Sequence, residues 1–431
     1  MAKRFEMNEV ELKEAVCKFY LNNKTDCDSI YLNAEKNIGK IYENIDDINL
    51  IHSLFIQTYF VVITANKYEK NVLHNNIFKL YRKKIKKFSI SLFPQRETKH
   101  ETYAYCFKWN GYTVLHIEAQ STGSYTIGGS ADIVRYIFNN QYIIPKGIVS
   151  LGICFGTDEV KYHLGDVVIS KKIYPYFIGS KIDEKGYFVT DDNIFIVDSS
   201  LSAKIKFIID KNAFSELNSD VYFGNYITGE AVVSRRKARR EFVQQTKQPI
   251  IAGEMEGYGL FKECKGTYYM VPCLIVKSIC DWAVMKNFEA KDIFERLCNE
   301  ADKVSEEEQR SLKDRIQAYA SFQAFKVLDI LLSNKIFGDS VFTDIIAYIE
   351  EFRGNAIYAV SIKDEIQNIV RRNKGDVQIT YKYVITVIKE LINRKILECD
   401  DFNELDSISN KREDEIEEWI VTKRRKVDVK K

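Results

Sequence analysis

Residues 248–283 read QPIIAGEMEGYGLFKECKGTYYMVPCLIVKSICDWA, and this stretch decides the fold of the chain. Its two apolar runs, PIIA and CLIV, predict short buried strands. Glu254 and Glu256 follow the first run, where a strand gives way to a helix. The second run ends at Val276 and leaves Asp281 just past the strand. Ligands of open α/β sheets bind beyond the carboxyl ends of strands, so these acids predict a site there. The alternative is that they only cap helices.

The order of these residues resembles that of a known family. Glu254-Met255-Glu256, followed by small residues, and then KSICD on the next strand are similar to motifs of the nucleoside phosphorylase / nucleosidase superfamily. The closest likeness is to methylthioadenosine and S-adenosylhomocysteine nucleosidases, and to nucleosidase modules of bacterial antiphage defence proteins. The resemblance implies an α/β fold: a three-layer αβα sandwich around a central mixed, twisted sheet.

Composition limits the class of protein. A chain of 431 residues suits two or three domains, and 45% hydrophobic with 29% charged residues predicts a folded core. The charged start, MAKRFE, does not resemble a signal peptide, and no apolar stretch reaches the roughly 20 residues of a membrane helix. Nine cysteines lack metal-type spacing. We therefore expect a cytoplasmic protein with reduced thiols, no metal, no cofactor and no membrane contact.

The run Tyr59–Ala65 is rich in β-branched residues and predicts a buried first strand, with a helix after it. In the family that this chain resembles, the first strand ends in an alanine, and a catalytic glutamate follows four residues later. Ala65 and Glu69 occupy those places. The resemblance implies that Ala65 lines the substrate site and that Glu69 deprotonates the attacking water. By spacing alone, Glu69 would be a surface acid favoured by the helix dipole.

Two predictions concern the segment after this helix. Residues 76–100 are strongly basic and predict a charged helix or connector with a solvated face. Residues 101–107 and 112–119 predict two strands, and Asn110-Gly111 between them is a strong hairpin signal.

Glycines mark the next predicted strand. Residues 147–156 form an apolar run that ends in glycine-rich turns, and residues 164–170 follow as another strand. Glycine permits a tight turn and the close approach of backbone to a ligand. The pair is similar to the base- and ribose-side strands of the superfamily, which implies that Gly156 contacts substrate. Asp166 is expected to shape the turn.

Residues 222–234 match the family strand that lies against the purine. Val232 stands about where nucleosidases often have a phenylalanine that stacks on the base. The basic run RRKARR follows directly and predicts a solvated helix face. In the alternative interpretation, Arg235 and Arg236 pair with phosphate, because arginine forks match phosphate geometry. The substrate would then be an adenine nucleotide.

The resemblance also assigns roles to the acids. Asp281 would protonate N7 of the purine, which requires a pKa raised by burial or by a neighbouring acid. Glu256 would accept hydrogen bonds from the ribose hydroxyls, with Glu254 beside it and Met255 against the sugar. Lys277 stands where many members have arginine. It either senses phosphate or pairs with an acid.

The expected domain order places the catalytic domain second. The segments are a helical N-terminal extension (1–55), a nucleosidase-like domain (56–335, with an insertion at about 285–312), a helical C-terminal domain (336–420) and a basic tail (421–431). The C-terminal domain resembles a winged helix, which would contact either DNA or a regulatory protein. The insertion would be a lid or an oligomer contact.

Three functions are compatible with these residues. The leading one is a purine nucleosidase that hydrolyses the N-glycosidic bond of an adenine nucleoside or nucleotide, ATP included, as an antiviral defence effector. The second is a phosphate-dependent purine nucleoside phosphorylase, which Glu69 disfavours because water needs a base. The third is a non-catalytic nucleotide sensor, against which the retained acids argue. By resemblance, we also expect a homo-oligomer, a dimer or higher.

Overall fold

The computed structural model describes most of the first 337 residues. The described residues are 7–36, 38–56, 58–92, 101–140, 143, 145–176, 181–182, 188–189, 194–230, 233, 236–266, 271–283, 290–297 and 304–337. The predicted C-terminal domain beyond Phe337, the basic tail, Val232 and Arg235 lie outside these residues, as do parts of the predicted insertion.

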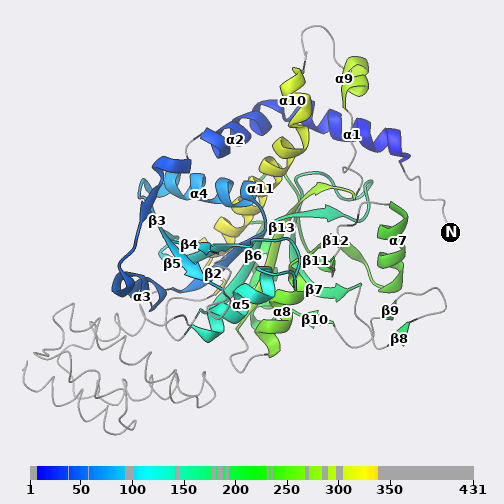
Figure 1. The fold of residues 1–431 in the computed structure, drawn as a ribbon. Helices are drawn as coiled ribbons and strands as arrows, with labels where there is room; N and C mark the ends of the chain where they lie inside the picture. The colour runs from blue at the N-terminus through cyan, green and yellow to red at the C-terminus, as the bar shows by residue number, and fades with distance from the viewer. Residues whose placement is uncertain are drawn as a thin grey trace, which may run out of the picture.

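A single large sheet of mixed parallel and antiparallel pairs forms the centre of the molecule (Figure 1). Its order is β1-β3-β4-β5-β2-β6-β12-β11-β7-β10, with β13 paired to both β6 and β7. The strands are β1 (Tyr42–Asn44), β2 (Phe60–Thr64), β3 (Ile85–Ser91), β4 (Glu101–Trp109), β5 (Tyr112–Glu118), β6 (Gly147–Gly156), β7 (Val167–Pro175), β10 (Phe195–Ile196), β11 (Val221–Thr228), β12 (Ile250–Glu254) and β13 (Cys273–Asp281), with a separate pair β8 (Lys181–Ile182) and β9 (Phe188–Val189).

The pairing of β13 closes part of this sheet into a ring. β13 runs parallel to β6 and antiparallel to β7, while β12 and β11 join β6 to β7 on the other side. Each strand therefore pairs with the next in the order β6, β12, β11, β7, β13 and back to β6, so that these strands form a closed ring. Side chains that point into such a ring are removed from water, which is why charged groups found there must be paired.

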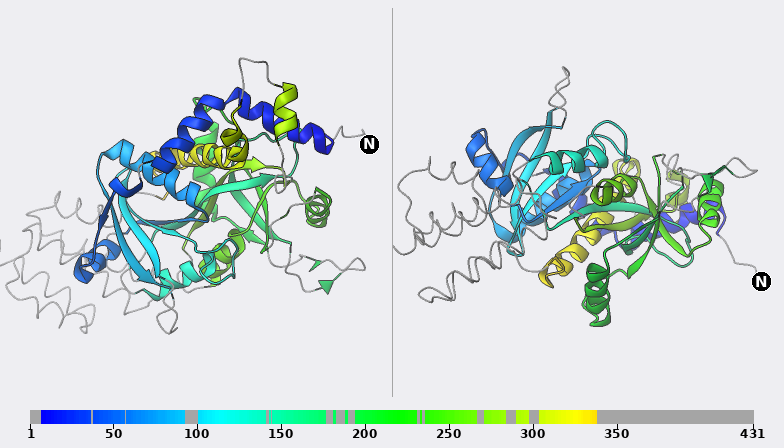
Figure 2. Two further views of the ribbon diagram at one scale, coloured as in Figure 1. Left: turned by 45° about the horizontal axis from the view of Figure 1, so that its top comes forward. Right: turned by 90° about the horizontal axis from the view of Figure 1, so that it is seen from below.

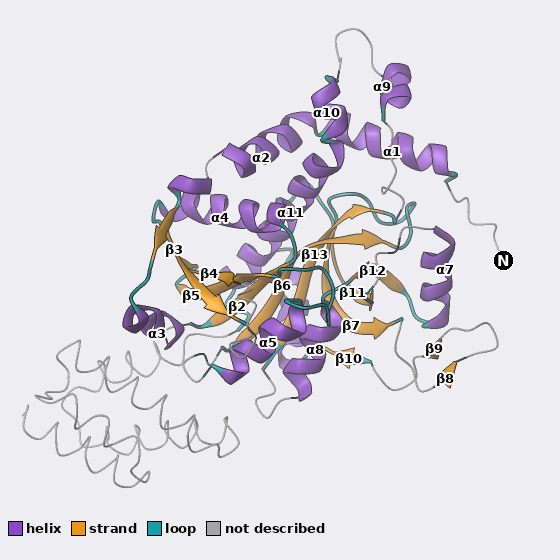
Figure 3. Cartoon of the chain, in the orientation of Figure 1, coloured by secondary structure: helices purple, strands orange, loops and turns teal. Residues whose placement is uncertain are grey.

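Helices cover both faces of the sheet (Figure 3). On one side α11 packs against β6 and β13, and α2 and α4 pack against α11; on the other side α8 packs against β13 and β7, with α5 beside it. The helices are α1 (Glu9–Asn22), α2 (Lys24–Lys36), η1 (Ile38–Lys40), α3 (Ile48–Ile56), α4 (Lys67–Tyr81), α5 (Ser130–Asn139), α6 (Ser199–Asp210), α7 (Arg236–Gln245), α8 (Gly257–Gly266), α9 (Lys291–Leu297), α10 (Glu306–Arg310) and α11 (Leu312–Ser333). None of the helices in the described ranges is both long and apolar enough to cross a membrane.

The predicted mixed α/β fold with a central sheet is confirmed, as are the first strand and the hairpin. In the hairpin, β4 and β5 pair antiparallel up to Trp109 opposite Tyr112. Asn110 and Gly111 between them have φ values of 47° and 86°, the left-handed region that this dipeptide tolerates.

Two predictions about elements were wrong. The basic segment after α4 contains the strand β3 and not a solvated helix, because Ile85, Phe88 and Ile90 are buried and the strand pairs antiparallel with β4. The strand predicted to stop at Val276 continues as β13 to Asp281, because it pairs with β6 over its whole length.

The N-terminal extension is built into the same core. Its helix α2 packs along α11, blue against yellow in Figure 2, and the Phe19 ring of α1 lies 5.5 Å from the Tyr319 ring of α11. Arg315 on α11 pairs with Asp28 on α2 at 2.5 Å. The extension also contributes the short strand β1, which pairs parallel with β3 at the edge of the sheet. The predicted helical extension therefore also contains a strand, which lies between η1 and α3.

Candidate functional site

Glu69 is held by the ends of two neighbouring strands. The sequence Asn-Lys-Tyr-Glu after β2 forms a capping box, in which the Asn66 side chain accepts from the Glu69 backbone N–H. The Glu69 carboxylate accepts backbone N–H bonds from Ala65 at 2.6 Å and Asn66 at 3.1 Å through Oε2. Through Oε1 it accepts from Ile153 of β6 at 2.9 Å. The carboxyl predicted as a surface acid by spacing alone is therefore buried.

Gly152 makes room for this carboxyl group, since a Cβ atom at that position would collide with it. Burial raises the pKa of Glu69 to about 7, and the charge of Glu256 also raises it, whereas Lys277 opposes the shift. A carboxyl group with this pKa exchanges its proton near neutral pH, which suits a general base.

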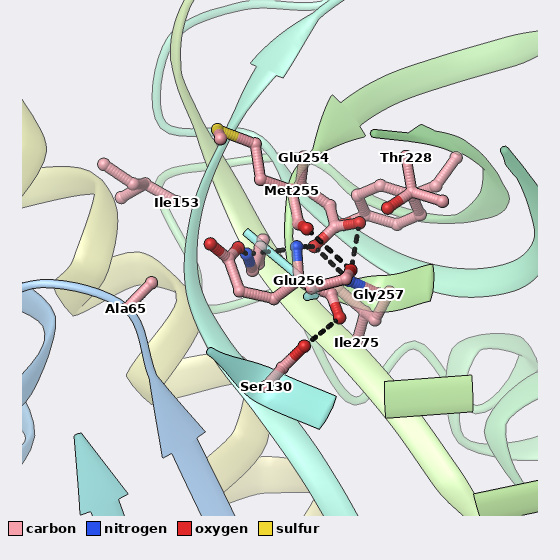
Figure 4. Close-up of polar contacts among 12 residues, drawn as sticks. Ala65, Ser130, Ile153, Thr228, Glu254, Met255, Glu256, Gly257 and Ile275 are labelled. Carbon is pink, nitrogen blue, oxygen red and sulfur yellow. Dashed lines mark hydrogen bonds and ion pairs between the residues drawn. The ribbon is translucent and has the colours of Figure 1, made fainter. Parts of the chain in front are cut away.

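A buried cluster of charges lies close enough to Glu69 to shift its pKa. Figure 4 shows two of its members, Glu254 and Glu256. Lys277 of β13 exposes 1% of its surface and donates to Glu256 at 2.5 Å and to Glu254 at 3.2 Å. Burial alone would lower the pKa of Lys277, but the two glutamates raise it. At Glu256, the charge and hydrogen bond of Lys277 together with backbone N–H bonds outweigh burial and lower the pKa, whereas burial raises that of Glu254. Of the two interpretations of Lys277, its described contacts match pairing with acids.

The two glutamates have different surroundings. Glu254 accepts backbone N–H bonds from Glu256 at 2.9 Å and from Gly257, the first residue of α8, at 2.9 and 3.0 Å. Glu254 therefore caps α8, which agrees with the alternative interpretation, in which these acids only cap helices. Glu256 instead accepts from the Gly123 backbone N–H at 3.3 Å and points to Lys277.

The glycine-rich loop between β5 and α5 supports this segment, and its role was missed in the sequence. Ser124 Oγ donates to the Met255 carbonyl at 2.9 Å and accepts from Gly259 N–H at 2.9 Å. Ser130 Oγ donates to the Glu256 carbonyl at 2.6 Å. The cluster of small polar residues in this loop, STGSYTIGGS, was the available signal. Met255 itself is half-buried, with its side chain directed to the same side as Ile153 (Figure 4).

Asp281 ends β13. Its Oδ1 accepts the Ala283 backbone N–H at 2.6 Å, and burial raises its pKa, with Lys313 and Arg239 opposing the shift. The register of the sheet relates it to the other acids. Phe155 of β6 is the pairing partner of Asp281 on one side and of Gly253 on the other.

The end of β6 therefore brings the predicted residues together. Ile153 N–H holds Glu69, and β6 lies between the strands that end in Glu254 and Asp281. Ala65 is half-buried at the end of β2, next to β6. Glu69, Lys277 and Asp281 lie beside residues 152–156 of β6, which ends at Gly156. Ala65 bonds to Glu69, and Glu254 and Glu256, with Met255 between them in the sequence, bond to Lys277.

One arginine of the basic run RRKARR is buried. Arg239 of α7 exposes 2%, pairs with Glu159 at 2.7 Å and donates to the carbonyls of Trp282 at 2.7 Å and Gly156 at 3.3 Å. Gly156 is thereby fixed at the end of β6. Arg236 begins α7, but its side chain and Arg235 lie outside the described parts of the chain. Phosphate binding by these two residues stays a prediction.

A mixed α/β sheet with buried acids at its strand ends defines the class of protein, and the sequence match agrees. The chain belongs to the phosphorylase superfamily, whose family model matches residues 60–313, more than half of the 431 residues. A more particular likeness is to the death domain-containing ATP nucleosidase of Amphimedon queenslandica. The two are 29% identical over 167 residues, which are 34% of this chain and 30% of that protein. The chain thus matches less than a third of the length of this relative.

Solved structures of similar fold include nucleosidases. One is the 5′-methylthioadenosine/S-adenosylhomocysteine nucleosidase of Neisseria meningitidis in complex with methylthio-immucillin-A. It has 16% identity and a TM-score of 0.45 over 64% of this chain and 99% of that chain. Another is the futalosine hydrolase of Helicobacter pylori, with 14% identity and a TM-score of 0.44 over 64% of this chain and 98% of that chain.

Proposed function

We propose that this protein is a purine nucleosidase that hydrolyses the N-glycosidic bond of an adenine nucleoside or nucleotide. One observation carries the proposal: Glu69 is a buried carboxyl group at the end of β2 with a pKa raised to about 7. Such a group takes a proton from water near neutral pH, as hydrolysis requires. Membership in the phosphorylase superfamily and the named activity of the Amphimedon relative support the same reaction.

In the proposed reaction, Glu69 and Asp281 act as base and acid on the two sides of the bond. Glu69 takes a proton from water as the water oxygen bonds to C1′ of the ribose. Asp281, whose pKa burial raises, gives its proton to N7 of the purine as the bond from C1′ to N9 breaks. The products are a ribosyl compound with a 1′-hydroxyl group and neutral adenine. The proton on Glu69 returns to Asp281 through solvent.

Glu256 is the proposed ribose ligand. The Lys277 ammonium at 2.5 Å lowers the pKa of Glu256 and keeps it ionised, so it accepts hydrogen bonds from ribose hydroxyls. These bonds hold the sugar while positive charge develops on its ring. Met255, half-buried beside Glu256, is proposed to pack against the sugar.

Water is the proposed nucleophile. A phosphate nucleophile needs a cationic pocket. Two buried cations of the described site, Lys277 and Arg239, are already paired with protein carboxylates, the first with Glu254 and Glu256 and the second with Glu159. Glu69, by contrast, accepts one N–H through Oε1, which leaves capacity for a bond from water.

The proposed substrate is an adenine nucleotide, with ATP the first candidate, because the Amphimedon relative is named an ATP nucleosidase. The resemblance to nucleosidase modules of antiphage defence proteins extends the proposal to an antiviral effector that depletes this nucleotide. Expression of the wild type, but not of Asp281→Asn, should then lower the ATP pool of bacterial cells.

Chromatography of a reaction mixture tests the activity. The purified full chain is incubated with ATP, adenosine, methylthioadenosine and inosine, each with and without phosphate. We expect free adenine without phosphate, lost in Asp281→Asn and retained in Asp210→Asn, an exposed acid at the end of α6. Base released only with phosphate would make the protein a phosphorylase. No release from any substrate would contradict the proposal.

A further inference from the structure

A chain of hydrogen bonds runs through the interior from the N-terminal extension to the strand that precedes Glu69. Tyr42 Oη lies 2.8 Å from His74 Nδ1, His74 Nε2 lies 3.0 Å from His116 Nδ1, and His116 Nε2 lies 2.9 Å from Thr64 Oγ1. We call these four residues the histidine chain. Both histidines are completely buried, and Thr64 exposes 1%.

The histidine chain joins elements that are far apart in the sequence. Tyr42 is on β1, which belongs to the N-terminal extension, and His116 is on β5. His74 is on α4, five residues after Glu69 and thus about 7.5 Å further along the helix axis. Thr64 ends β2 directly before Ala65, which donates to the Glu69 carboxylate. The helix that carries Glu69 is therefore tied to two strands of the sheet and to its edge strand.

The bonds of the chain depend on one another. Burial lowers the pKa of both histidines, that of His116 to about 3 and that of His74 well below its usual value. A neutral imidazole has one donor and one acceptor nitrogen. If His74 Nε2 donates to His116, Tyr42 must donate to His74 and His116 must donate to Thr64; otherwise all three bonds reverse. Loss of either end leaves a buried nitrogen without its partner.

The position of α4 determines the geometry of Glu69. The Glu69 side chain is on α4, whose N-cap is Asn66, whereas the Ala65 and Ile153 N–H groups that bind its carboxylate belong to the end of β2 and to β6. A shift of the helix relative to the strands lengthens these bonds and displaces the carboxylate. Lys70 of α4 pairs with Glu118 of β5 at 2.6 Å and resists the same shift.

We propose that the histidine chain is a positioning network that makes the N-terminal extension part of the catalytic site. By completing the chain, Tyr42 holds α4, and with it Glu69, in place against β2 and β6. The proposal rests on the proposed nucleosidase function, in which Glu69 is the base. Displacement of β1 from β3 at the sheet edge would then lower turnover without any contact to substrate.

Variants at the two ends of the chain test this network in the full-length protein. Tyr42→Phe and Thr64→Val each remove one terminal hydroxyl group. We expect kcat for adenine release to fall about tenfold or more in each, with KM within about twofold, because small displacements of a catalytic group reduce the rate strongly. The control is Tyr105→Phe: its ring lies 4.5 Å from that of His74 and 5.4 Å from that of Tyr42, but its hydroxyl group is not a member of the chain.

The double variant distinguishes a network from two separate effects. If both ends belong to one chain, Tyr42→Phe with Thr64→Val should have about the kcat of either single variant, because interacting sites are not additive. Losses that multiply, or a lowered melting temperature with kcat unchanged in both single variants, would overturn the proposal.

Nuclear magnetic resonance of the histidine ring nitrogens gives a readout without turnover. At pH 5.5 the rings of His74 and His116 should both be neutral, and Tyr42→Phe should shift the nitrogens of both. A shift confined to His74 would overturn the network. A wild type that releases no adenine would contradict the proposed function and remove the catalytic role of the chain, whereas coupled shifts would still establish the chain itself.

Discussion

At the scale of single residues, contacts decide which acid exchanges a proton. Glu69 and Glu256 are both buried, yet their pKa values move in opposite directions. Glu256 has the Lys277 ammonium at 2.5 Å, and its charge and hydrogen bond, together with backbone N–H bonds, outweigh the effect of burial. Glu69 has only backbone N–H donors at that range. The raised pKa suits Glu69 to exchange a proton near neutral pH, whereas the lowered pKa keeps Glu256 ionised, as the proposed ribose ligand requires.

The pH dependence of the proposed hydrolysis should reflect Glu69. Its carboxyl group must be ionised to act as a base, so kcat/KM should fall about tenfold per pH unit below about pH 7. The decline of an unperturbed glutamate would begin near pH 4.5. Initial rates of adenine release, measured from pH 4 to 9 at low substrate, check this. An acidic limb near pH 4.5 would show that Glu69 is not the base.

Glu69→Gln should reduce activity and change how stability depends on pH. We expect kcat to fall by about 10²–10⁴-fold, the usual contribution of a general base. In the wild type, the raised pKa means that the unfolded chain loses a proton between pH 4.5 and about 7 while the native state keeps it. Stability from this group is therefore present below pH 4.5 and is lost as the pH rises to 7, by about 3 kcal/mol in total.

The Glu69→Gln variant does not lose stability in this way, because its side chain does not ionise. Urea unfolding at pH 4.5 and 7.5 gives the free energy of unfolding of both proteins. Relative to the wild type, the variant should be about 3 kcal/mol more stable at pH 7.5 than it is at pH 4.5. Glu216→Gln, at an exposed position, serves as the control and should show no comparable change. An equal difference at both pH values would contradict the raised pKa.

At the scale of elements, α4 approaches β6 closely, and this approach positions the carboxylate of Glu69, the proposed base. Gly152→Ala would insert a methyl group into the space of the Glu69 carboxyl group, so we expect kcat to fall about a hundredfold. Gly39→Ala is a matched control, because a Cβ atom there meets nothing within 4 Å. Near-wild-type turnover of Gly152→Ala would mean that the carboxyl group does not need this position.

The helix α7 is tied to the ends of β6 and β13 through Arg239. Arg239→Met removes the cation that faces buried Glu159 and the donor to two carbonyl groups, so we expect a loss of about 3–5 kcal/mol of stability. Lys237→Met changes a cation on the same helix with a side chain 88% exposed, and it should cost about 0.5 kcal/mol or less. Chemical denaturation of both variants measures the difference. Equal midpoints would contradict this role of Arg239.

At the scale of the whole molecule, the N-terminal extension and the catalytic domain share one hydrophobic core. Leu12 and Val16 of α1 belong to the same buried cluster as Phe60 of β2 and Leu328 of α11. We therefore expect α1 and β2 to open together. Hydrogen exchange, followed by mass spectrometry in increasing denaturant, should give peptides of both the same opening free energy. Earlier opening of α1 would indicate a separately folded extension.

Helices, strands and turns that local sequence patterns define could be predicted from the sequence. The β-branched run before Ala65, the helix after it and the Asn-Gly hairpin are confirmed where they were expected. The strand β3 was missed because its lysines resemble a solvated face, and only pairing with β4 makes it a strand. The support from Ser124 and Ser130 was missed for the same reason: their cluster of small polar residues indicates a loop, but not its hydrogen-bond partners more than a hundred residues away.

The sequence by itself determined the α/β class, the superfamily and the candidate acids Glu69, Glu256 and Asp281. The class follows from apolar runs and turns, which depend on neighbouring residues alone, and the superfamily and the acids follow from the resemblance of short motifs to those of a known family. The tertiary structure decided that β13 closes the ring, that Lys277 pairs with two glutamates, and that Glu254 caps a helix. Burial and ion pairing depend on which distant segments meet in space, and the same contacts set the pKa values on which the proposed chemistry depends.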